Sequence, residues 1–488
     1  MKKVYMLVHG IALGKGGMTS AMLVRSHYFY NHNIQGDLVT LDYNPDYPEI
    51  IATLKKNKMD ERTNMINMFQ YFDQDSLTGT INDNQTEDSY LQTLETYIKI
   101  PKDNTARFFD KDTGNYACYV RFEGNHIKII DEMNNAKRSK RIHFINGLVS
   151  HIEYFNENNQ KHYEVFFNAE GHPYLSRQCN AKTGTIGSCF VLSRNKHFAN
   201  NIELSQYFLN DIVDDETSII CDGPGSFRKI LGLENKNVKL FAVLHARHFE
   251  NWADTKTFKP DLKFILDNAD KIDGVITLTE GQKQDIQRDF NIQNIYTIPN
   301  FITLNSEPDH TYGSKVVGTI SRFSKEKGFD RMLDVAKIVS DLDPTIQFHL
   351  YGSGNYLDPT AAKIKKLHLE NSVTLKGYTS NPIKTLQDFD LVISASHYEG
   401  QGLSMIEAME QKVPVVAFDI QYGPSDFIND QENSYLIDDG DINAMAIQIV
   451  KALNTPDQLE KMGLQARKDI TAMYNPDNIM SKWHNILN

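Results

Sequence analysis

The sequence predicts an α/β protein with two Rossmann-like, parallel-sheet domains that face a cleft, and an antiparallel β-rich insertion in the first domain. Apolar strand-like runs alternate with amphipathic helical stretches in residues 1–75 and 201–300, and again in 301–470. Residues 76–200 instead show short β-rich segments separated by turn signals, which is typical of an antiparallel meander. The length of 488 residues exceeds what one ordinary core organises, so several domains are expected.

The first 75 residues predict one half of a nucleotide-binding unit. An apolar stretch from Lys2 to Gly10 is followed by a glycine loop at 14–20, an amphipathic stretch at 21–30 and a second strand at 38–41. Strand, glycine loop and helix in this order form such a unit. The loop lacks the spacing of G-x-G-x-x-G, and no G-K-[ST] follows it, so it is not a Walker A loop. Alone, it is a weak signal of a bound nucleotide.

The insertion predicts a sheet with exposed edges and a basic cluster. Glycine-containing turn signals at 113–115, 123–125 and 170–171 separate segments that are apolar on alternate residues. Sheets of this kind often pair at their edges between subunits. The basic cluster consists of Lys137, Arg138, Lys140 and Arg141. Two interpretations stay open for it, a solvated turn and a contact with an anionic acceptor.

Parallel-sheet patterning resumes after the insertion and repeats in the second domain. The strands expected in the rest of the first domain lie at 218–221, 240–244, 274–278 and 295–298. A polar linker then leads to Val316, where the second domain begins. Its further strands are expected at 348–351, 373–375, 391–394 and 415–418. Helical patterns separate these strands, which predicts a parallel sheet.

The run 398–408 is the most informative part of the sequence. An apolar strand ends before it and a helical pattern follows, so it predicts a strand–turn–helix unit that carries two carboxylates, Glu399 and Glu407. Gly400 and Gly402 lack Cβ atoms, which lets the backbone approach a ligand. The N–H groups at the start of the helix favour an anion. Such a unit can hold a polyhydroxylated, phosphorylated molecule at both ends.

A structural alternative exists for the second carboxylate. Ser404-x-x-Glu407 fits a capping box, in which the glutamate only satisfies a free backbone N–H at the helix start. Taken without its glycines and its partner carboxylate, the pattern supports capping as well as it supports ligand binding.

Other polar side chains follow the predicted strands. Arg322 and Lys327 come after the first strand of the second domain, where they can neutralise a diphosphate. His245 ends a strand, His248 comes three residues later, and Tyr378 follows another strand. Because ligands bind at the carboxyl ends of parallel strands, these positions favour a shared site. Each side chain alone is also compatible with an ordinary structural role.

These motifs resemble those of retaining nucleotide-sugar glycosyltransferases of the GT-B fold, family 4, and among them the TarM/TagE-type wall teichoic acid α-glycosyltransferases. The resemblance covers essentially the whole chain and rests on the runs Lys15–Ser20, Cys221–Phe227, Tyr398–Met409 and Tyr422–Phe427. The last two runs are shared with the protein O-GlcNAc transferases of serine-rich adhesins, a competing family. The loop after Arg322 departs from the family pattern, so only Arg322 and Lys327 carry over there.

The resemblance implies a retaining hexosyltransferase. Such an enzyme moves glucose or N-acetylglucosamine from a UDP-sugar onto poly(glycerol phosphate) or poly(ribitol phosphate) with α linkage. The acceptor hydroxyl attacks from the face that the diphosphate leaves, and a phosphate oxygen takes the proton. Alternatives are protein O-GlcNAc transfer, a nucleotide-sugar epimerase, and a non-catalytic sugar-binding subunit. The last would be expected to have lost Arg322, Lys327 or Glu407.

The resemblance and the local chemistry together assign roles. The expected catalytic residues are Arg322, Lys327, Glu399 and His245. The expected donor-binding residues are Gly16, Gly17, Tyr378, Gly402, Leu403, Ser404 and Glu407. The weaker acceptor-binding candidates are Lys137, Arg138, Lys140, Arg141 and His248. By resemblance, residues 471–488 form a helix that crosses back to the N-terminal domain, and the insertion builds a homotrimer.

The amino-acid composition limits the binding partners and the cellular location that are expected. The chain carries 51 basic and 63 acidic residues, a formal net charge of −12, which argues against a nucleic-acid partner. Its four scattered cysteines fit a reducing compartment. No signal peptide or membrane span is recognised, so a cytoplasmic location is expected, with a peripheral contact to the inner membrane face left open. The D-x-D pairs lie outside the donor motifs, so no metal or other cofactor is expected.

Overall fold

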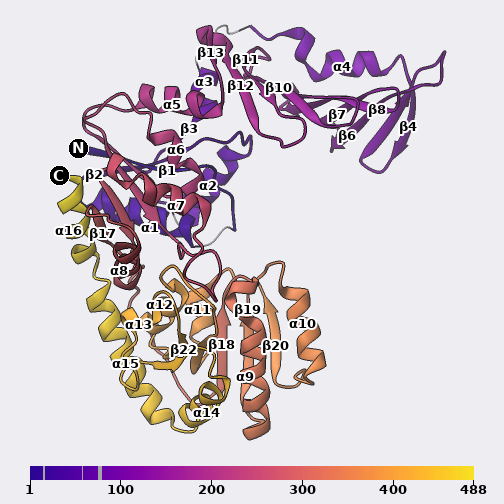
Figure 1. Ribbon diagram of the computed structural model, residues 1–488. Coiled ribbons are helices and arrows are strands. Elements are labelled where there is room, and N and C mark those ends of the chain that lie inside the picture. The colour runs from indigo at the N-terminus through magenta and orange to yellow at the C-terminus, as the bar shows by residue number, and fades with distance from the viewer. Residues whose placement is uncertain (15–16, 58, 75–79) are drawn as a thin grey trace.

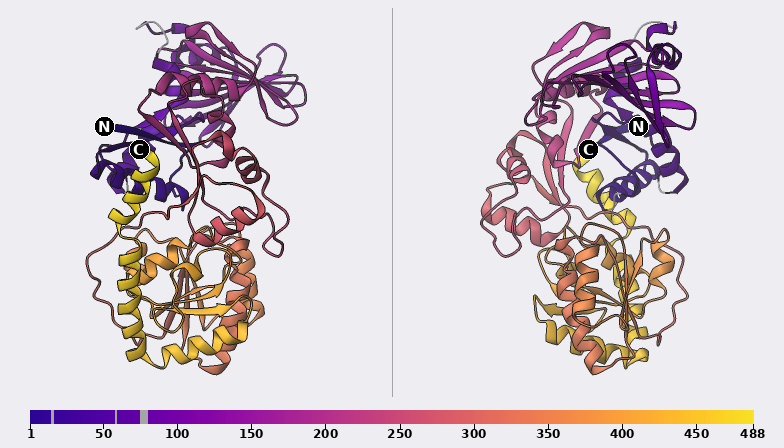
Figure 2. Two further views of the ribbon diagram at one scale, coloured as in Figure 1. Left: turned by 60° about the vertical axis from the view of Figure 1, so that its left-hand side comes forward. Right: turned by 90° about the vertical axis from the view of Figure 1, so that its right-hand side faces the viewer.

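The computed structural model describes residues 1–14, 17–57, 59–74 and 80–488. These residues form two parallel-sheet domains and a third, antiparallel sheet (Figure 1). The predicted α/β class with a β-rich insertion is confirmed. The insertion projects from the far side of the N-terminal domain, and the C-terminal domain lies opposite to it in all views (Figure 2).

The N-terminal domain is built on a seven-stranded parallel sheet of order β17-β16-β15-β14-β1-β2-β3. Its central strands are buried along their whole length, as expected for a sheet covered by helices on both faces. The strands are β1 (Lys2–Val8), β2 (Ile34–Thr40), β3 (Met65–Asn67), β14 (Thr217–Cys221), β15 (Lys239–Leu244), β16 (Gly274–Thr277) and β17 (Ile295–Thr297). The helices are α1 (Met18–Asn31), α2 (Tyr47–Asn57), α3 (Met68–Gln74), α5 (Asn201–Ile212), α6 (Phe227–Ile230), α7 (Pro260–Asp267) and α8 (Glu280–Asp289).

The insertion forms a ten-stranded antiparallel meander in which each strand pairs with the next in sequence. Local turns therefore fix its topology. Its strands are β4 (Ile98–Lys102), β5 (Thr105–Phe109), β6 (Tyr116–Glu123), β7 (His126–Asn134), β8 (Lys137–Ile145), β9 (Leu148–Phe155), β10 (Lys161–Phe167), β11 (Pro173–Cys179), β12 (Ile186–Val191) and β13 (Lys196–Phe198), with α4 (Glu87–Leu94) beside them. The outermost strand β4 exposes about half of Ile98 and Ile100.

The basic cluster of the insertion lies on strand β8 and not in a turn, so that interpretation was wrong. The turn sits one step earlier, at Asn135 and Ala136, which both have positive φ. On β8, the cluster faces the acidic residues of β7 across the sheet. Arg138 and Arg141 pair with Asp131, and Lys140 pairs with Glu132. Antiparallel register thus partly neutralises the cluster.

The C-terminal domain has a six-stranded parallel sheet of order β20-β19-β18-β21-β22-β23. Its strands are β18 (Val316–Ile320), β19 (Gln347–Tyr351), β20 (Val373–Gly377), β21 (Leu391–Ser394), β22 (Val415–Asp419) and β23 (Tyr435–Asp438). Its helices are α9 (Phe329–Leu342), α10 (Leu357–Lys366), α11 (Pro382–Leu386), α12 (Leu403–Glu410), α13 (Pro424–Phe427), α14 (Ile442–Leu453) and α15 (Pro456–Met473). Short 3-10 helices in the chain lie at Asp83–Gln85, Leu192–Arg194, Pro224–Ser226, Ala269–Lys271 and Lys325–Lys327.

The last helix, α16 (Pro476–Leu487), returns to the N-terminal domain, as the resemblance implies (Figure 1). Its buried Trp483 meets Phe29 of α1 edge to face, with ring centroids 5.5 Å apart. The guanidinium of Arg25 lies over the other part of the indole, 5.2 Å from the ring centroid. One buried apolar cluster accordingly contains side chains from both parallel-sheet domains.

None of the helices in the described parts of the chain combines the length and the apolar character that crossing a bilayer would require.

Replacing Trp483 by alanine should destabilise the protein by about 3–5 kcal/mol, because a large buried aromatic side chain leaves a cavity between α16 and α1. Urea unfolding measures the change. Met473→Ala is the matched control, since Met473 is 44% exposed at the end of α15 and should give a change near zero. Equal stability of the two variants would show that α16 is not docked as described.

Candidate functional site

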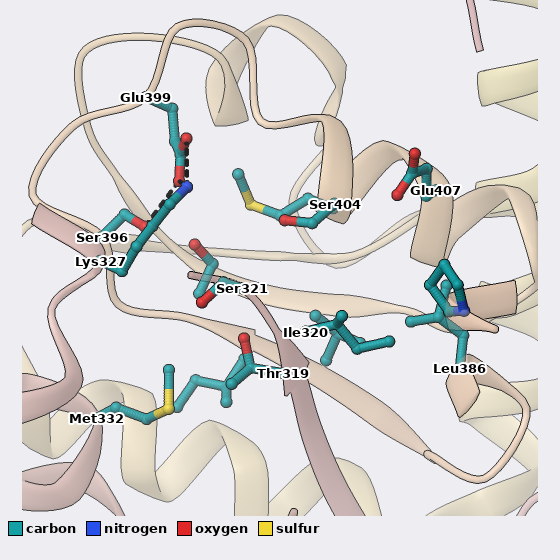
Figure 3. Close-up of a pocket in the computed structure, with 15 residues that line it drawn as sticks. Thr319, Ile320, Ser321, Lys327, Met332, Leu386, Ser396, Glu399, Ser404 and Glu407 are labelled. Carbon is teal, nitrogen blue, oxygen red and sulfur yellow. Dashed lines mark hydrogen bonds and ion pairs between the residues drawn. The ribbon is translucent and has the colours of Figure 1, made fainter. Parts of the chain in front are cut away.

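A pocket opens at the carboxyl end of the C-terminal sheet, where the sequence places its strongest motif (Figure 3). Strands β18 and β21 form its floor, and the start of helix α12 forms one wall. Its polar lining comes from these elements and from the segments that follow β18 and β21: Thr319, Ser321, Lys327, Ser394, Ser396, Glu399, Ser404 and Glu407. This edge of the sheet is where ligands bind in open α/β folds.

An ion pair stands at one end of the pocket. The ammonium of Lys327 donates to both carboxylate oxygens of Glu399, at 2.6 and 2.9 Å, and Ser396 donates to the same carboxylate at 2.8 Å. Figure 3 shows the two charged side chains meeting at the side of the pocket opposite Glu407. Glu399 thereby fixes the position of a cation that points at the pocket. Ser396 was not predicted, although it lies two residues after a buried strand.

Helix α12 presents its N-terminus to the pocket. It begins at Leu403, after Gly402 with φ of 92° as the N-cap, and no side chain caps it. Ser404 is therefore already inside the helix, and the capping-box interpretation of Ser404-x-x-Glu407 was wrong. The N–H groups of Met405 and Ile406 donate to the carbonyl of Gly402. Those of Leu403 and Ser404 come before them, at the helix end that favours an anion. Glu407 lies one turn further along and lines the pocket (Figure 3).

The glycine turn also brings the two domains together. A Cβ atom at Gly400 would overlap the carbonyl oxygen and carbon of His245, which directly follows β15 in the N-terminal domain. Only a residue without a side chain allows this backbone approach. The turn that carries Glu399 is thus seated directly on the N-terminal strand end.

A buried charge network holds His245. Nε2 of His245 lies 2.6 Å from Oδ1 of Asp222, and Arg25 bonds the same oxygen at 2.5 Å. Burial alone would raise the pKa of Asp222, but Arg25 and His245 outweigh it and lower that pKa below its usual value. The ionised carboxylate fixes the orientation of the imidazole. Asp222 lies at a strand end, which is the sequence feature that made His245 a candidate. Arg25 had no comparable feature in the sequence.

The remaining donor-site candidates lie apart from the pocket lining. Arg322 is directed outward, with a side chain 71% exposed and paired to Glu326 at 2.7 Å. Tyr378 is 70% exposed after β20, a position compatible with a stacking surface. Gly17 forms the N-cap of α1 with φ of 38°, and a Cβ there would meet no atom within 4 Å. Gly16 lies outside the described residues.

His248 is a structural residue, so its assignment to acceptor binding was wrong. Its side chain is fully buried, stacked parallel to the rings of Phe258 and Tyr422, and neither ring nitrogen has a hydrogen-bond partner. Burial lowers the pKa of His248 to about 4. A neutral, enclosed imidazole cannot contact an acceptor from this position.

One cluster among the described residues has the composition of a metal site: His151, Glu153 and Glu164 on the insertion sheet. Its charges are already balanced. Lys161 pairs with both glutamates, at 3.1 and 2.7 Å, and Arg177 pairs with Glu164 at 2.6 Å. This arrangement is a cross-strand ion-pair network and lies on a different sheet from the pocket.

Comparison with known proteins gives a consistent relationship. The family model for group 1 glycosyl transferases matches residues 304–469. The chain is 44% identical, over 100% of both chains, to the poly(ribitol-phosphate) alpha-N-acetylglucosaminyltransferase of Staphylococcus aureus (strain COL). It is 24% identical to the poly(glycerol-phosphate) alpha-glucosyltransferase of Bacillus subtilis (strain 168), over 99% of this chain and 74% of that protein.

Solved structures agree with these relationships. The crystal structure of TarM superimposes with a TM-score of 0.95 at 44% identity, covering 100% of this chain and 99% of that one. A variant of S. aureus TarM crystallised with fondaparinux, alpha-GlcNAc-glycerol and UDP gives the same TM-score at 43% identity, with both chains fully covered. The pneumococcal O-GlcNAc transferase GtfA shares the fold, with a TM-score of 0.80 at 21% identity over 100% of this chain and 98% of that one.

Gly400→Ala should lower the turnover of the enzyme about a hundredfold, because a methyl group there pushes the turn away from His245 and small displacements of reacting groups are costly. Initial-rate measurements test this. Gly187→Ala is the control, since a Cβ at that strand position meets only ordinary contacts, the nearest at 3.7 Å. Full activity of the Gly400 variant would contradict the described domain contact.

Acid should destabilise the protein through His248. The folded-state pKa of about 4 lies below the usual 6.5, so the unfolded chain binds a proton that the folded chain does not. The contribution of His248 to the free energy of unfolding is fully present above pH 6.5 and is lost as the pH falls towards 4. This contribution is at most about 3 kcal/mol. His248→Phe keeps a stacked ring but removes the titration. Its unfolding free energy should vary less than that of the parent protein across this range, and an identical pH profile would refute the assignment.

Proposed function

This chain belongs to the teichoic acid α-glycosyltransferases of the TarM type, and from that premise we propose that it transfers N-acetylglucosamine or glucose from a UDP-sugar to a polyol-phosphate polymer with retention of configuration. The observation that carries the proposal is the pocket in which the Lys327–Glu399 ion pair and the open N-terminus of α12 lie together. This combination of a cation, free backbone N–H groups and carboxylates suits a diphosphate that is joined to sugars.

The leaving diphosphate would lie between Lys327 and the first turn of α12. Lys327 supplies a positive charge whose position is set by Glu399, and the N–H groups of α12 supply the second half of the stabilisation. Arg322 would have to turn inward from its exposed position to add a fork of donors. The acceptor hydroxyl would attack on the face that the diphosphate leaves, and a phosphate oxygen would take its proton. In this proposal the leaving diphosphate is neutralised without a metal ion.

The N-terminal domain would complete the site from the other side. His245 is placed there by its bond to Asp222, and its main chain touches Gly400. Glu407, further along α12, is suited to hold ribose hydroxyls, because an ionised carboxylate accepts hydrogen bonds from two hydroxyls at once. Nucleotide and transferred sugar would thus be held mainly by the C-terminal domain, and the acceptor would enter from the N-terminal side.

Similarity favours one substrate pair among those considered. The identity of 44% to a poly(ribitol-phosphate) N-acetylglucosaminyltransferase supports N-acetylglucosamine and poly(ribitol phosphate) before glucose and poly(glycerol phosphate). Protein O-GlcNAc transfer is less well supported, because the GtfA relative of Streptococcus agalactiae is 24% identical. The acceptor polymer is an anion and the protein has a net charge of −12, so binding would rely on local cations. On strand β8, Lys137 is exposed and remains a candidate.

A homotrimer formed through the insertion is part of the proposal. The edge strand β4 supports it, because Ile98 and Ile100 are 49% and 54% exposed on an unpaired edge of the described sheet. Several active sites on one assembly would raise the effective concentration of a polymer with many acceptor repeats. Light scattering of the intact protein would test the assembly. The cytoplasmic location and a peripheral membrane contact likewise remain proposals.

A substrate panel tests the proposed reaction directly. The protein is incubated with UDP-glucose or UDP-N-acetylglucosamine and with purified ribitol or glycerol teichoic acid, and product linkage is determined by NMR. We expect α-linked N-acetylglucosamine on the ribitol polymer, formed equally well with excess chelator. Transfer to a serine-rich protein alone would favour the competing family. Loss of activity in chelator, restored by magnesium or manganese, would refute the metal-independent mechanism.

Glu407→Gln should weaken UDP binding while leaving the fold intact. Losing a charged hydrogen-bond acceptor in a partly enclosed site costs roughly 1.5–3 kcal/mol, which is about tenfold to a hundredfold in affinity. Calorimetric titration with UDP measures it. Glu432→Gln, an exposed carboxylate of the same domain, is the control and should bind UDP normally. Unchanged UDP affinity of the Glu407 variant together with a lowered melting temperature would assign Glu407 a purely structural role.

A further inference from the structure

The backbone of Glu399 is held by a second segment of the C-terminal domain, residues 421–422. The N–H of Glu399 donates to the carbonyl of Gln421, and the N–H of Tyr422 donates to the carbonyl of Glu399, each at 3.2 Å. The position of Glu399, and of the glycine turn that follows it, therefore depends on where residues 421–422 lie. This segment directly follows β22 and the residues after it begin α13.

Both side chains of that segment are bonded from the N-terminal domain. Arg247 donates to Oε1 of Gln421 at 2.9 Å. Asp285, on helix α8, accepts from Nε2 of Gln421 at 3.1 Å and from the hydroxyl of Tyr422 at 2.6 Å. A chain of hydrogen bonds thus runs from Arg247 and Asp285 of one domain, through Gln421 and Tyr422, to the backbone of Glu399 in the other.

Arg247 is costly to keep in this place. Its side chain is 2% exposed, its Nε has no hydrogen-bond partner, and no carboxylate among the described residues forms an ion pair with it. Its other hydrogen bonds go to main-chain carbonyls, including that of Asn251 at 2.9 Å. Burying an unpaired charge is strongly unfavourable, and an apolar residue of similar volume would serve packing better. The hydrogen bond to Gln421 therefore points to a positioning role for Arg247 rather than a role in stability.

The same part of the N-terminal domain carries His245. Arg247 lies two residues after His245, and the carbonyl of Ala246 between them accepts from Gln282 at 2.9 Å, three residues before Asp285 on α8. This hydrogen bond joins the segment after β15 to the start of α8. A shift of these two segments relative to the C-terminal domain must break the bonds to residues 421–422 or carry Glu399 along.

We propose that Arg247 and Asp285 are positioning residues for sugar transfer, acting through Gln421 and Tyr422 to hold Glu399 and its turn in register with His245. The inference rests on the proposed function, since it assumes that Glu399 and His245 act on the same donor sugar. Neither Arg247 nor Asp285 belongs to the lining of the pocket between β18, β21 and α12. Their loss should therefore lower kcat and leave UDP affinity unchanged, because the nucleotide would be held mainly by the C-terminal domain.

Two variants interrupt the chain of bonds at different points. Tyr422→Phe removes only the hydroxyl bonded to Asp285. Arg247→Met keeps an unbranched apolar side chain, shorter than that of arginine, while removing the donor to Gln421. Arg288→Gln is the matched control. Arg288 also pairs with Asp285, at 2.7 Å, but its side chain is exposed, and among the described residues it forms no ion pair with the C-terminal domain. Each variant is measured for kcat, donor KM, UDP affinity by calorimetry, and small-angle X-ray scattering with UDP bound.

We expect kcat of the two variants to fall about tenfold to a hundredfold, as for other small misplacements of reacting groups. UDP affinity should match the parent protein, scattering should show a more open molecule, and Arg288→Gln should behave as the parent does. Unchanged kcat in Tyr422→Phe, or a loss of UDP affinity in proportion to kcat, would overturn the positioning role. If the parent protein transfers none of the sugars tested, the proposed function fails separately. The scattering measurement then still tests the positioning role. A domain arrangement unchanged in both variants would overturn the inference.

Discussion

The approach of two backbones, at Gly400 and at the carbonyl of His245, is the constraint on which the candidate site depends. Each main-chain segment continues from a strand of a different parallel sheet, so neither can withdraw without moving its domain. The linker contributes to the same junction, because Asn300 donates twice to the buried side chain of Gln401 in the glycine turn. The glycine turn is therefore seated against the His245 main chain, and the absence of a side chain at residue 400 permits this approach.

Charges around this junction occur in bonded groups. Lys327 is held by Glu399, which also accepts from Ser396. His245 is held by Asp222, which is bonded by Arg25, and the guanidinium of Arg25 in turn lies over the indole of Trp483. Buried ion pairs contribute little net stability, because desolvation offsets their attraction. Their value here is geometric, since each places a cation or an imidazole at a fixed point beside the pocket. The C-terminal helix α16 thus supports the site as well as the fold.

The insertion is formed and stabilised in a different way from the two parallel-sheet domains. Its strands pair in sequence order, so short turns determine its topology. Part of the sheet, including Phe166 and Leu175, also packs in one buried cluster with the N-terminal domain. Cross-strand pairs of opposite charge, such as Arg141 with Asp131, stabilise it and reduce the positive potential of the basic cluster. The proposed anionic acceptor would need local cations on this acidic protein, and Lys137 is left exposed on β8 for that contact.

The sequence by itself determined the architecture and the location of the pocket. Sheet type, the insertion and the strand–turn–helix unit around Glu399 and Glu407 follow from hydrophobic periodicity and glycine spacing, which are local properties of the chain. Ligand chemistry at strand ends follows from the general geometry of parallel sheets. For this reason Lys327, Glu399, Ser404 and Glu407 were predicted together and are found together in the pocket lining.

Only the tertiary structure decided which side chains meet from distant segments. It buried His248 between aromatic rings, turned Arg322 outward, and placed the basic cluster on a strand opposite acidic residues. It also revealed the bonds of Asp222 with Arg25 and of Arg247 with Gln421. No local pattern encodes these contacts, because each joins residues that lie far apart in the sequence and meet only in the folded chain.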